Sequence, residues 1–147
     1  MDFKKAGRAT IGWRARALSG VPRNALAGHP LYGSGESFVL PRGEIGRTSF
    51  ETGLDLHVGY SRLLSKGMDL ELFGDLFNVF NDQGTASVDE QYSSASDSNP
   101  IVGGTYEDLI FAKELDTPET IERNPNFGNV DGRYPPLSVQ FGARLSF

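Results

Sequence analysis

Three carboxylates on one strand-like stretch are the residues of this sequence best placed to do chemistry. Asp69, Glu71 and Asp75 alternate with apolar residues in GMDLELFGDLFNVF, so in a β-strand they would share one face. A pair of carboxyl groups on one face is what a glycoside hydrolase uses. A charged face that lines water shows the same alternation, and that interpretation explains every position without catalysis. We therefore expect no enzyme and no catalytic residue.

The sequence gives little support for a metal, a cofactor or a nucleic acid. His57 falls on the same face as the carboxylates and His29 falls in a loop, which is not the spacing of metal ligands. The chain has no cysteine, which excludes disulfides and thiolate metal sites. Its formal net charge of -5 argues against general binding to phosphate backbones. Acidic residues gather between 81 and 136 without the spacing of a calcium loop.

Four stretches alternate between apolar and polar residues, which predicts strands near residues 9–19, 52–61, 67–80 and 137–147. One face of these strands is charged and is expected to face a water-filled lumen. The other is apolar and is expected to face lipid. The charged face carries Arg14, Arg16, Asp55, Asp69, Glu71, Asp75 and Arg144. The apolar face carries Trp13, Leu54, Leu56, Tyr60, Leu70, Leu72 and Phe141.

The length of these strands favours a membrane. Strands of soluble proteins usually have about 5–6 residues, whereas a tilted strand that crosses a bilayer needs about 9–11. Charges on one face could not sit in a dry core without partners. A soluble sandwich could show the same alternation, so a soluble β-rich binding or adhesion module stays open as an alternative.

The connections between the predicted strands follow the order long, short, long. Residues 20–51 and 81–136 form the long ones, and a short turn falls near residues 61–66. Outer-membrane barrels have short turns on the periplasmic side and long loops outside. That arrangement would make the last strand run toward the periplasm and end there at Phe147. The stretch LIFA at Leu109–Ala112 is expected to form a helical turn or a small strand.

Two stretches of the sequence resemble a known family. PRGEIGRTSFETGLDLHVGYSRLLSKGMDLELFGDLFNVFN and RNPNFGNVDGRYPPLSVQFGARLSF resemble the last barrel strands of TonB-dependent outer-membrane receptors. The closest branch is the Oar-like receptors, which carry a carboxypeptidase-regulatory-like domain at the N-terminus. The resemblance covers the chain from about Gly12, except between Gly84 and Thr120. It implies an all-β fold, namely antiparallel up-and-down strands of a transmembrane barrel with about 22 strands.

The end of the chain, QFGARLSF, is similar to the signal that the barrel-assembly machinery recognises in this kind of protein. The resemblance assigns that role to Gln140, Gly142, Leu145 and Phe147. An unpaired edge strand readily pairs with another strand, which gives such a machine something to bind before the barrel closes.

The resemblance implies part of a receptor for energised uptake of a large or scarce substrate, in the outer membrane of a Gram-negative bacterium. Its partners would be outer-membrane lipid, the assembly machinery and, through a missing N-terminal part, the TonB system. The N-terminus MDFKKAGRATIGW shows no signal peptide, and no plug or TonB box is found. Four strands cannot enclose a lumen. We therefore expect a C-terminal fragment that does not transport alone.

Overall fold

The computed structural model describes residues 2–3, 7–65, 67–95 and 97–147. Two compact units account for them. The first, called the sheet unit, falls within Met1–Leu18, Glu51–Gln83 and Tyr134–Phe147. The second, called the loop unit, comprises Ser19–Phe50 and Gly84–Arg133. Each unit therefore combines segments that lie far apart in the sequence.

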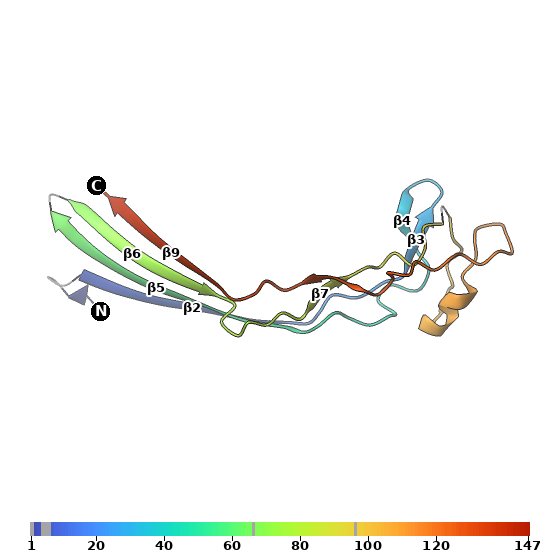
Figure 1. Cartoon of the computed structure of the whole chain (residues 1–147), viewed down its shortest axis with the longest axis horizontal. Helices are drawn as coiled ribbons and strands as arrows, with labels where there is room; N and C mark the ends of the chain where they lie inside the picture. Colours follow the sequence, from blue (N-terminus) through green and yellow to red (C-terminus); the bar gives the residue numbers. More distant parts are fainter. Residues whose placement is uncertain (1, 4–6, 66, 96) are drawn as a thin grey trace. The chain divides into compact units, whose positions relative to one another are not determined.

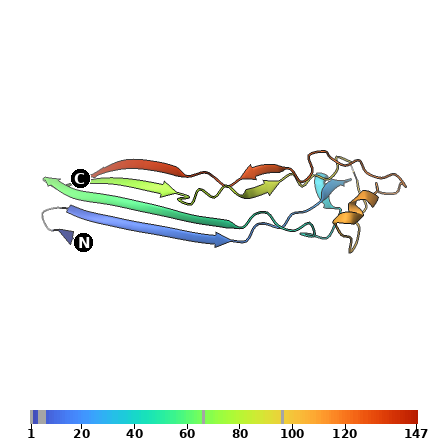
Figure 2. The ribbon, with the colours of Figure 1, turned by 60° about the horizontal axis from the view of Figure 1, so that its bottom comes forward.

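The sheet unit is one antiparallel sheet in the order β1-β2-β5-β6-β9 (Figure 1). Both views show β2 beside β5 and β9 beyond β6 (Figures 1 and 2). This confirms the prediction of an all-β fold with antiparallel up-and-down strands. The strands are β1 (Asp2–Phe3), β2 (Gly7–Leu18), β5 (Glu51–Ser65), β6 (Met68–Phe77) and β9 (Ser138–Ser146).

The bounds of β5 and β6 differ from the sequence-based ranges. β6 ends at Phe77 rather than at residue 80, because Asn78 has a φ of 52° and leaves the extended conformation. β5 begins at Glu51, which the sequence placed in a loop, and continues to Ser65. The short turn expected near 61–66 is therefore later and tighter, with Gly67 at a φ of 87°. Lys66 of that turn lies outside the described residues.

The loop unit is built from the two long connections, which contain structure of their own. β3 (Leu26–His29) pairs with β4 (Gly33–Phe38), and β7 (Thr85–Val88) pairs with β8 (Val130–Arg133). The stretch LIFA falls largely within a short 3-10 helix, η1 (Tyr106–Phe111), so it is a helical turn and not a strand. The pairing of β7 with β8 thus brings together the two ends of the loop-unit segment Gly84–Arg133.

A small apolar core holds the loop unit together. The ring of Tyr92 packs edge-on against Phe127, with centroids 5.1 Å apart, and its hydroxyl donates to the carbonyl of Leu109 at 2.9 Å. Backbone amides of Tyr92 and Ile101 donate to Leu26 and Val39, which ties the two connections to each other. The buried members of this core are Ala25, Ala27, Val39, Leu40, Tyr92, Leu109, Ala112, Ile121 and Phe127.

Burial of Tyr92 gives a prediction for stability at alkaline pH. Burial raises the pKa of Tyr92 above its ordinary value of 10.0, although the nearby charge of Arg123 opposes the shift. The neutral phenol therefore stabilises the fold fully below pH 10.0, and this contribution is lost as the pH rises through the folded-state pKa. We expect the melting temperature to fall more steeply above pH 10.0 than it does in Tyr92→Phe.

The comparison with Tyr92→Phe isolates this residue, because the other titrating groups are common to both proteins. At neutral pH, the variant should lose about 1 kcal/mol from the missing hydrogen bond to Leu109. Identical slopes for the two proteins would contradict the assignment.

Candidate functional site

Strand register sorts the predicted site residues onto two faces of the sheet. Arg14 lies opposite Asp55, and Glu71 lies opposite Arg144, while Trp13 lies opposite Leu56. Alternation along each strand then places the remaining residues. All seven residues expected in the lumen share one face, called here the charged face. All seven expected at lipid share the opposite face, called the apolar face.

The charged face carries cross-strand ion pairs. Arg16 Nε lies 2.6 Å from Glu51 Oε1, and its Nη1 lies 3.2 Å from Asp55 Oδ2. Arg144 Nη1 lies 3.3 Å from Glu71 Oε2. These pairs join β2 to β5 and β9 to β6, so two carboxylates considered for catalysis or for a lumen are held by neighbouring cations.

The remaining predicted residues of the charged face are Asp75, Arg14 and Asp69. His57 Nδ1 lies 2.6 Å from Asp75 Oδ1, so that carboxylate also has a partner on the adjacent strand. Arg14 and Asp69 make no ion pair within the described part of the chain. The suggestion of a hydrolytic pair at Asp69 and Glu71 gains no support, because Glu71 is engaged by Arg144.

The apolar face exposes large side chains. The exposed fraction is 73% for Trp13 and 83% for Phe141, while Tyr60 and Leu72 are exposed to a lesser degree. Leu54, Leu56 and Leu70 are partly buried by their neighbours. The buried hydrophobic side chains of the described chain all lie in the loop unit. The sheet is therefore held by its strand pairing and polar contacts and leaves an apolar surface uncovered.

Two glycines let phenylalanine rings lie flat across the β6–β9 pair. Phe73 lies opposite Gly142 on the charged face, and Phe141 lies opposite Gly74 on the apolar face. A Cβ on Gly142 would lie 2.2 Å from the ring of Phe73, and one on Gly74 would lie 3.3 Å from Phe141. A side chain at Gly142 would therefore displace the Phe73 ring.

The other residues of the proposed assembly signal lie on β9 or directly after it. Gln140 is opposite Asp75, and Leu145 is opposite Leu70 near the turn that joins β5 to β6. Phe147 follows β9 and its side chain is 98% exposed. The four residues thus divide between the two faces, and they do not form one cluster.

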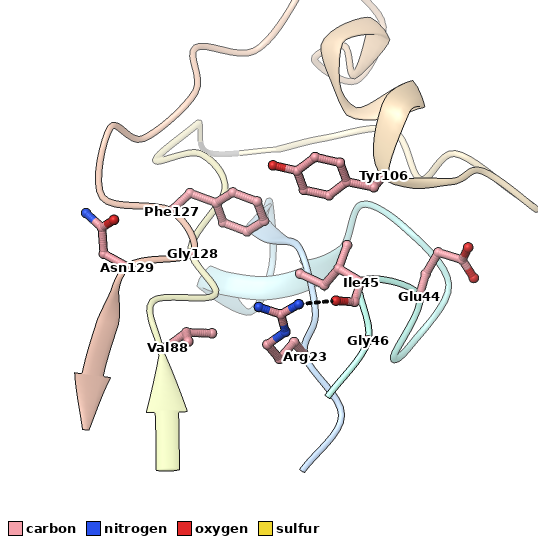
Figure 3. Close-up of a pocket in the computed structure, with 9 residues that line it drawn as sticks. All are labelled: Arg23, Glu44, Ile45, Gly46, Val88, Tyr106, Phe127, Gly128 and Asn129. Atoms are coloured by element: carbon pink, nitrogen blue, oxygen red, sulfur yellow. Dashed lines mark hydrogen bonds between the residues drawn. The ribbon is translucent and has the colours of Figure 1, made fainter. Parts of the chain in front are cut away.

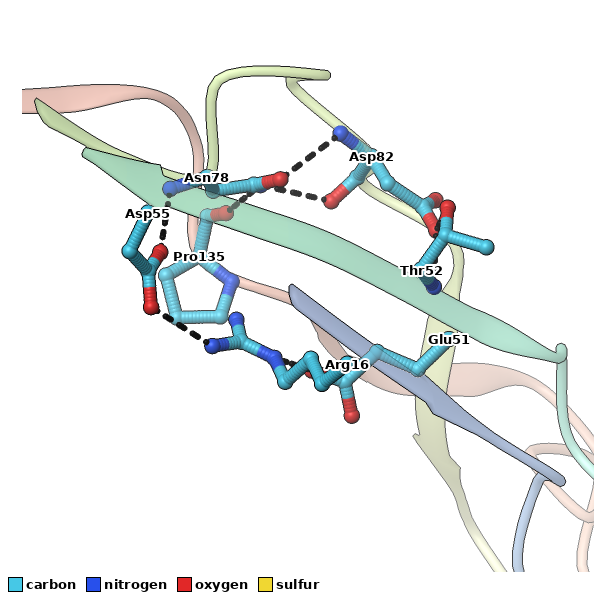
Figure 4. Close-up of polar contacts among 7 residues, drawn as sticks. All are labelled: Arg16, Glu51, Thr52, Asp55, Asn78, Asp82 and Pro135. Atoms are coloured by element: carbon cyan, nitrogen blue, oxygen red, sulfur yellow. Dashed lines mark hydrogen bonds and ion pairs between the residues drawn. The ribbon is translucent and has the colours of Figure 1, made fainter. Parts of the chain in front are cut away.

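A polar network at the other end of β6 centres on Asn78, which is 4% exposed (Figure 4). Its side-chain amide donates to the carbonyls of Pro135 at 2.6 Å and Asp82 at 3.0 Å. Its backbone N–H donates to Asp55 Oδ1 at 2.9 Å. The carboxylate of Asp82 in turn accepts from the backbone N–H and hydroxyl of Thr52 at 3.0 and 3.1 Å.

This network joins the ends of four strands. Asp55 also accepts from Arg16 of β2, and Asp82 and Thr52 connect the segment after β6 to the start of β5. Pro135 lies three residues before Ser138, the first residue of β9. The network therefore fixes the points where the long connections leave the sheet.

The loop unit contains a cavity of about 630 Å³ (Figure 3). Arg23 lies in its wall and donates from Nη2 to the carbonyl of Ile45 at 2.6 Å. Its Nε is buried and has no hydrogen-bond partner in the described part of the chain. The cavity is lined by Arg23, Glu44, Ile45, Gly46, Val88, Tyr106, Phe127, Gly128 and Asn129.

The described residues contain no group of three His, Asp or Glu side chains that could hold a metal ion. Their helical content is also limited, and none of it forms a helix with the length and hydropathy needed to cross a bilayer.

The chain is similar in sequence to a known transport protein. The chain is 36% identical over 158 residues to the TonB-dependent transporter Oar of Myxococcus xanthus, a match that covers 99% of this chain and 15% of that protein. This similarity supports a segment related to a TonB-dependent receptor. No model of a protein family matches the chain, and no solved structure does. The chain thus spans a small part of the Oar transporter that it matches.

Sequence reasoning missed three residues with structural roles in this TonB-receptor-like segment, two in the sheet unit and one in the loop unit. Glu51 was placed in a loop, although continuing the alternation of β5 by two residues would have put it on the charged face. Asn78 was treated as part of a strand, but an asparagine between two apolar residues at a strand end is a signal for a left-handed turn residue. Arg23 sits in an irregular loop and has no such signal.

Substitution of Asn78 should destabilise the sheet unit. Asn78→Ala leaves two carbonyls without their donor and forces alanine into a left-handed conformation. We expect a loss of about 2–4 kcal/mol in the free energy of unfolding. Asn78→Gly removes the conformational part and should lose about 1 kcal/mol less.

Denaturant unfolding followed through Trp13, the chain's single tryptophan, measures this loss in the sheet unit. The matched control is Asn126→Ala, an exposed asparagine of the loop unit, which should change stability by less than about 0.5 kcal/mol. Asn78→Ala with wild-type stability would show that the network does not hold the sheet.

Proposed function

We propose that this chain is a C-terminal portion of the β-barrel of a TonB-dependent outer-membrane receptor of the Oar-like branch, which carries a carboxypeptidase-regulatory-like domain. Such a receptor takes up a large or scarce substrate with energy passed from the TonB system. The observation that carries the proposal is the apolar face of the sheet, backed by the similarity to the Oar transporter along the whole chain.

A membrane is favoured because exposing the apolar face to water costs free energy. Soluble monomers rarely expose a contiguous apolar patch of more than a few hundred Å². Trp13 of β2, Phe141 of β9 and Leu72 of β6 are 73%, 83% and 51% exposed on the apolar face of the sheet. Lipid chains would cover this surface, while the charged face would line an aqueous lumen.

Strand length supports the same conclusion. β2 has 12 residues, β5 has 15, β6 has 10 and β9 has 9. A strand that crosses a bilayer at a tilt needs about 9–11 residues. The edges of the sheet at β1 and β9 have no further strand partner among the described residues, so closure of a barrel requires strands from elsewhere in the receptor.

The chain by itself is proposed to be an incomplete receptor. Energised uptake would need the remaining strands, a plug and a segment that contacts the TonB system. Gln140, Gly142, Leu145 and Phe147 are proposed to be recognised by the barrel-assembly machinery. The long connections that make up the loop unit belong on the outer side of the membrane in this proposal, and the turn between β5 and β6 on the periplasmic side.

Membrane insertion of the apolar face is tested by substituting two neighbouring residues. Phe141 and Gln140 are adjacent on β9 and lie on opposite faces. We expect Phe141→Arg to weaken insertion of the full chain into lipid vesicles by about 2–4 kcal/mol, the cost of a cation facing mid-bilayer lipid. Gln140→Arg places the same charge on the charged face and should change insertion by less than about 1 kcal/mol, because a lumen-facing cation stays in water.

Insertion is measured by vesicle flotation and by quenching of Trp13 fluorescence with brominated acyl chains. Equal effects of the two arginines would contradict the assignment of the faces. A chain that stays in buffer as a folded monomer without lipid or detergent would favour the alternative, a soluble β-rich binding or adhesion module.

A further inference from the structure

The cavity of the loop unit is lined by an arginine, Arg23, that forms no ion pair with any described residue. A guanidinium has five N–H donors, and among the described residues that of Arg23 donates one hydrogen bond, to the carbonyl of Ile45. Its Nε is buried and lacks a partner in the described part of the chain. Buried polar groups in folded proteins are almost always satisfied, so this nitrogen is an exception.

Acidic residues close in sequence to those that line the cavity form hydrogen bonds with residues other than Arg23. Both carboxylate oxygens of Glu90 accept from the side chain of Asn24, at 3.2 and 3.1 Å. Asp89 accepts from the backbone of Gln91 and from Asn124. Glu44 lines the cavity, but its carboxylate points away from Arg23 (Figure 3). Arg23 therefore forms no ion pair with them in a chain that has more acidic than basic residues.

The rest of the cavity is suited to an apolar body. Ile45, Val88 and Phe127 form apolar parts of its wall, and Val88 and Phe127 are 7% and 5% exposed. Tyr106 and Asn129 are exposed residues of the lining, so the cavity is open to solvent on their side. A volume of about 630 Å³ lies within the range of small-molecule sites and exceeds what a bare inorganic anion fills.

From these observations we propose that the loop unit binds a small organic acid, with its carboxylate on Arg23 and its aromatic or branched apolar body against Ile45, Val88 and Phe127. A planar carboxylate matches the fork of a guanidinium. The site lies within the loop unit, so the proposal holds whether or not the sheet spans a membrane. Its failure would leave the proposed receptor function untouched.

The test uses the full chain and a fluorinated probe, 3-(4-fluorophenyl)propionate, titrated by ¹⁹F NMR. The neutral amide of the same compound is the ligand control, and acetate tests whether the apolar body matters. We expect saturable binding of the acid and at least about tenfold weaker binding of both the amide and acetate, because the site requires both the charge and the apolar body.

Arg23→Gln should weaken binding of the acid by about tenfold or more, because it removes the charge that the carboxylate meets. Arg42→Gln is the matched control: Arg42 is exposed, belongs to the same unit and lies outside the cavity, so its loss should change binding by less than about twofold. Equal binding of acid and amide, no binding of the acid, or an unaffected Arg23→Gln variant would each overturn the proposal.

Loss of the Arg23 hydrogen bond to Ile45 could also unfold the loop unit, which the methyl signals of Val39 and Leu40 would report. In that case Arg23→Lys, which keeps the charge, decides the question. Preference of this variant for the acid over the amide supports the site, and equal binding of the two overturns it.

Discussion

Asn78 is the residue on which the geometry of the sheet unit depends. Extended strands diverge where their pairing stops, and here the polar network around Asn78 joins the ends of four of them. The amide of Asn78 reaches the carbonyl before β9, its backbone N–H reaches Asp55 of β5, and its left-handed φ of 52° turns the chain out of β6. Asparagine is among the few residues other than glycine that tolerate this conformation and also supply a donor and an acceptor.

The two units are stabilised by different interactions. In the loop unit, Tyr92, Phe127 and small residues such as Ala25 and Ala27 form a buried core, so the hydrophobic effect acts inside the protein. In the sheet unit, large side chains such as Trp13 and Phe141 stay exposed, and backbone pairing with cross-strand contacts remains. A sheet of this kind gains its hydrophobic stabilisation from whatever covers its outer surface, which in the proposed function is lipid.

Sequence predicts the parts of this structure that repeat with a fixed period. The alternation of residues such as Trp13, Leu56 and Phe141 assigns each to a face, because one face of a strand repeats every second residue. The core of the loop unit has no such period: Val39, Tyr92 and Ile121 come from irregular segments whose contacts are set by long-range packing. The cavity around Arg23 could not be predicted for the same reason, since an arginine in a loop is ordinarily a solvated charge.

The pairing of Gly142 with Phe73 changes how the end of the chain is interpreted. A glycine in a strand weakens it unless something needs the space, and here the ring of Phe73 occupies the position where a Cβ would lie. Recognition by an assembly machine is therefore not required to explain this glycine, because folding of the β6–β9 pair already demands it. Phe147 differs, since its side chain is 98% exposed and none of the described residues pairs with it across a strand. Of the residues in the proposed signal, Gly142 is thus explained by strand packing, whereas the exposed ring of Phe147 is open to recognition from outside the sheet.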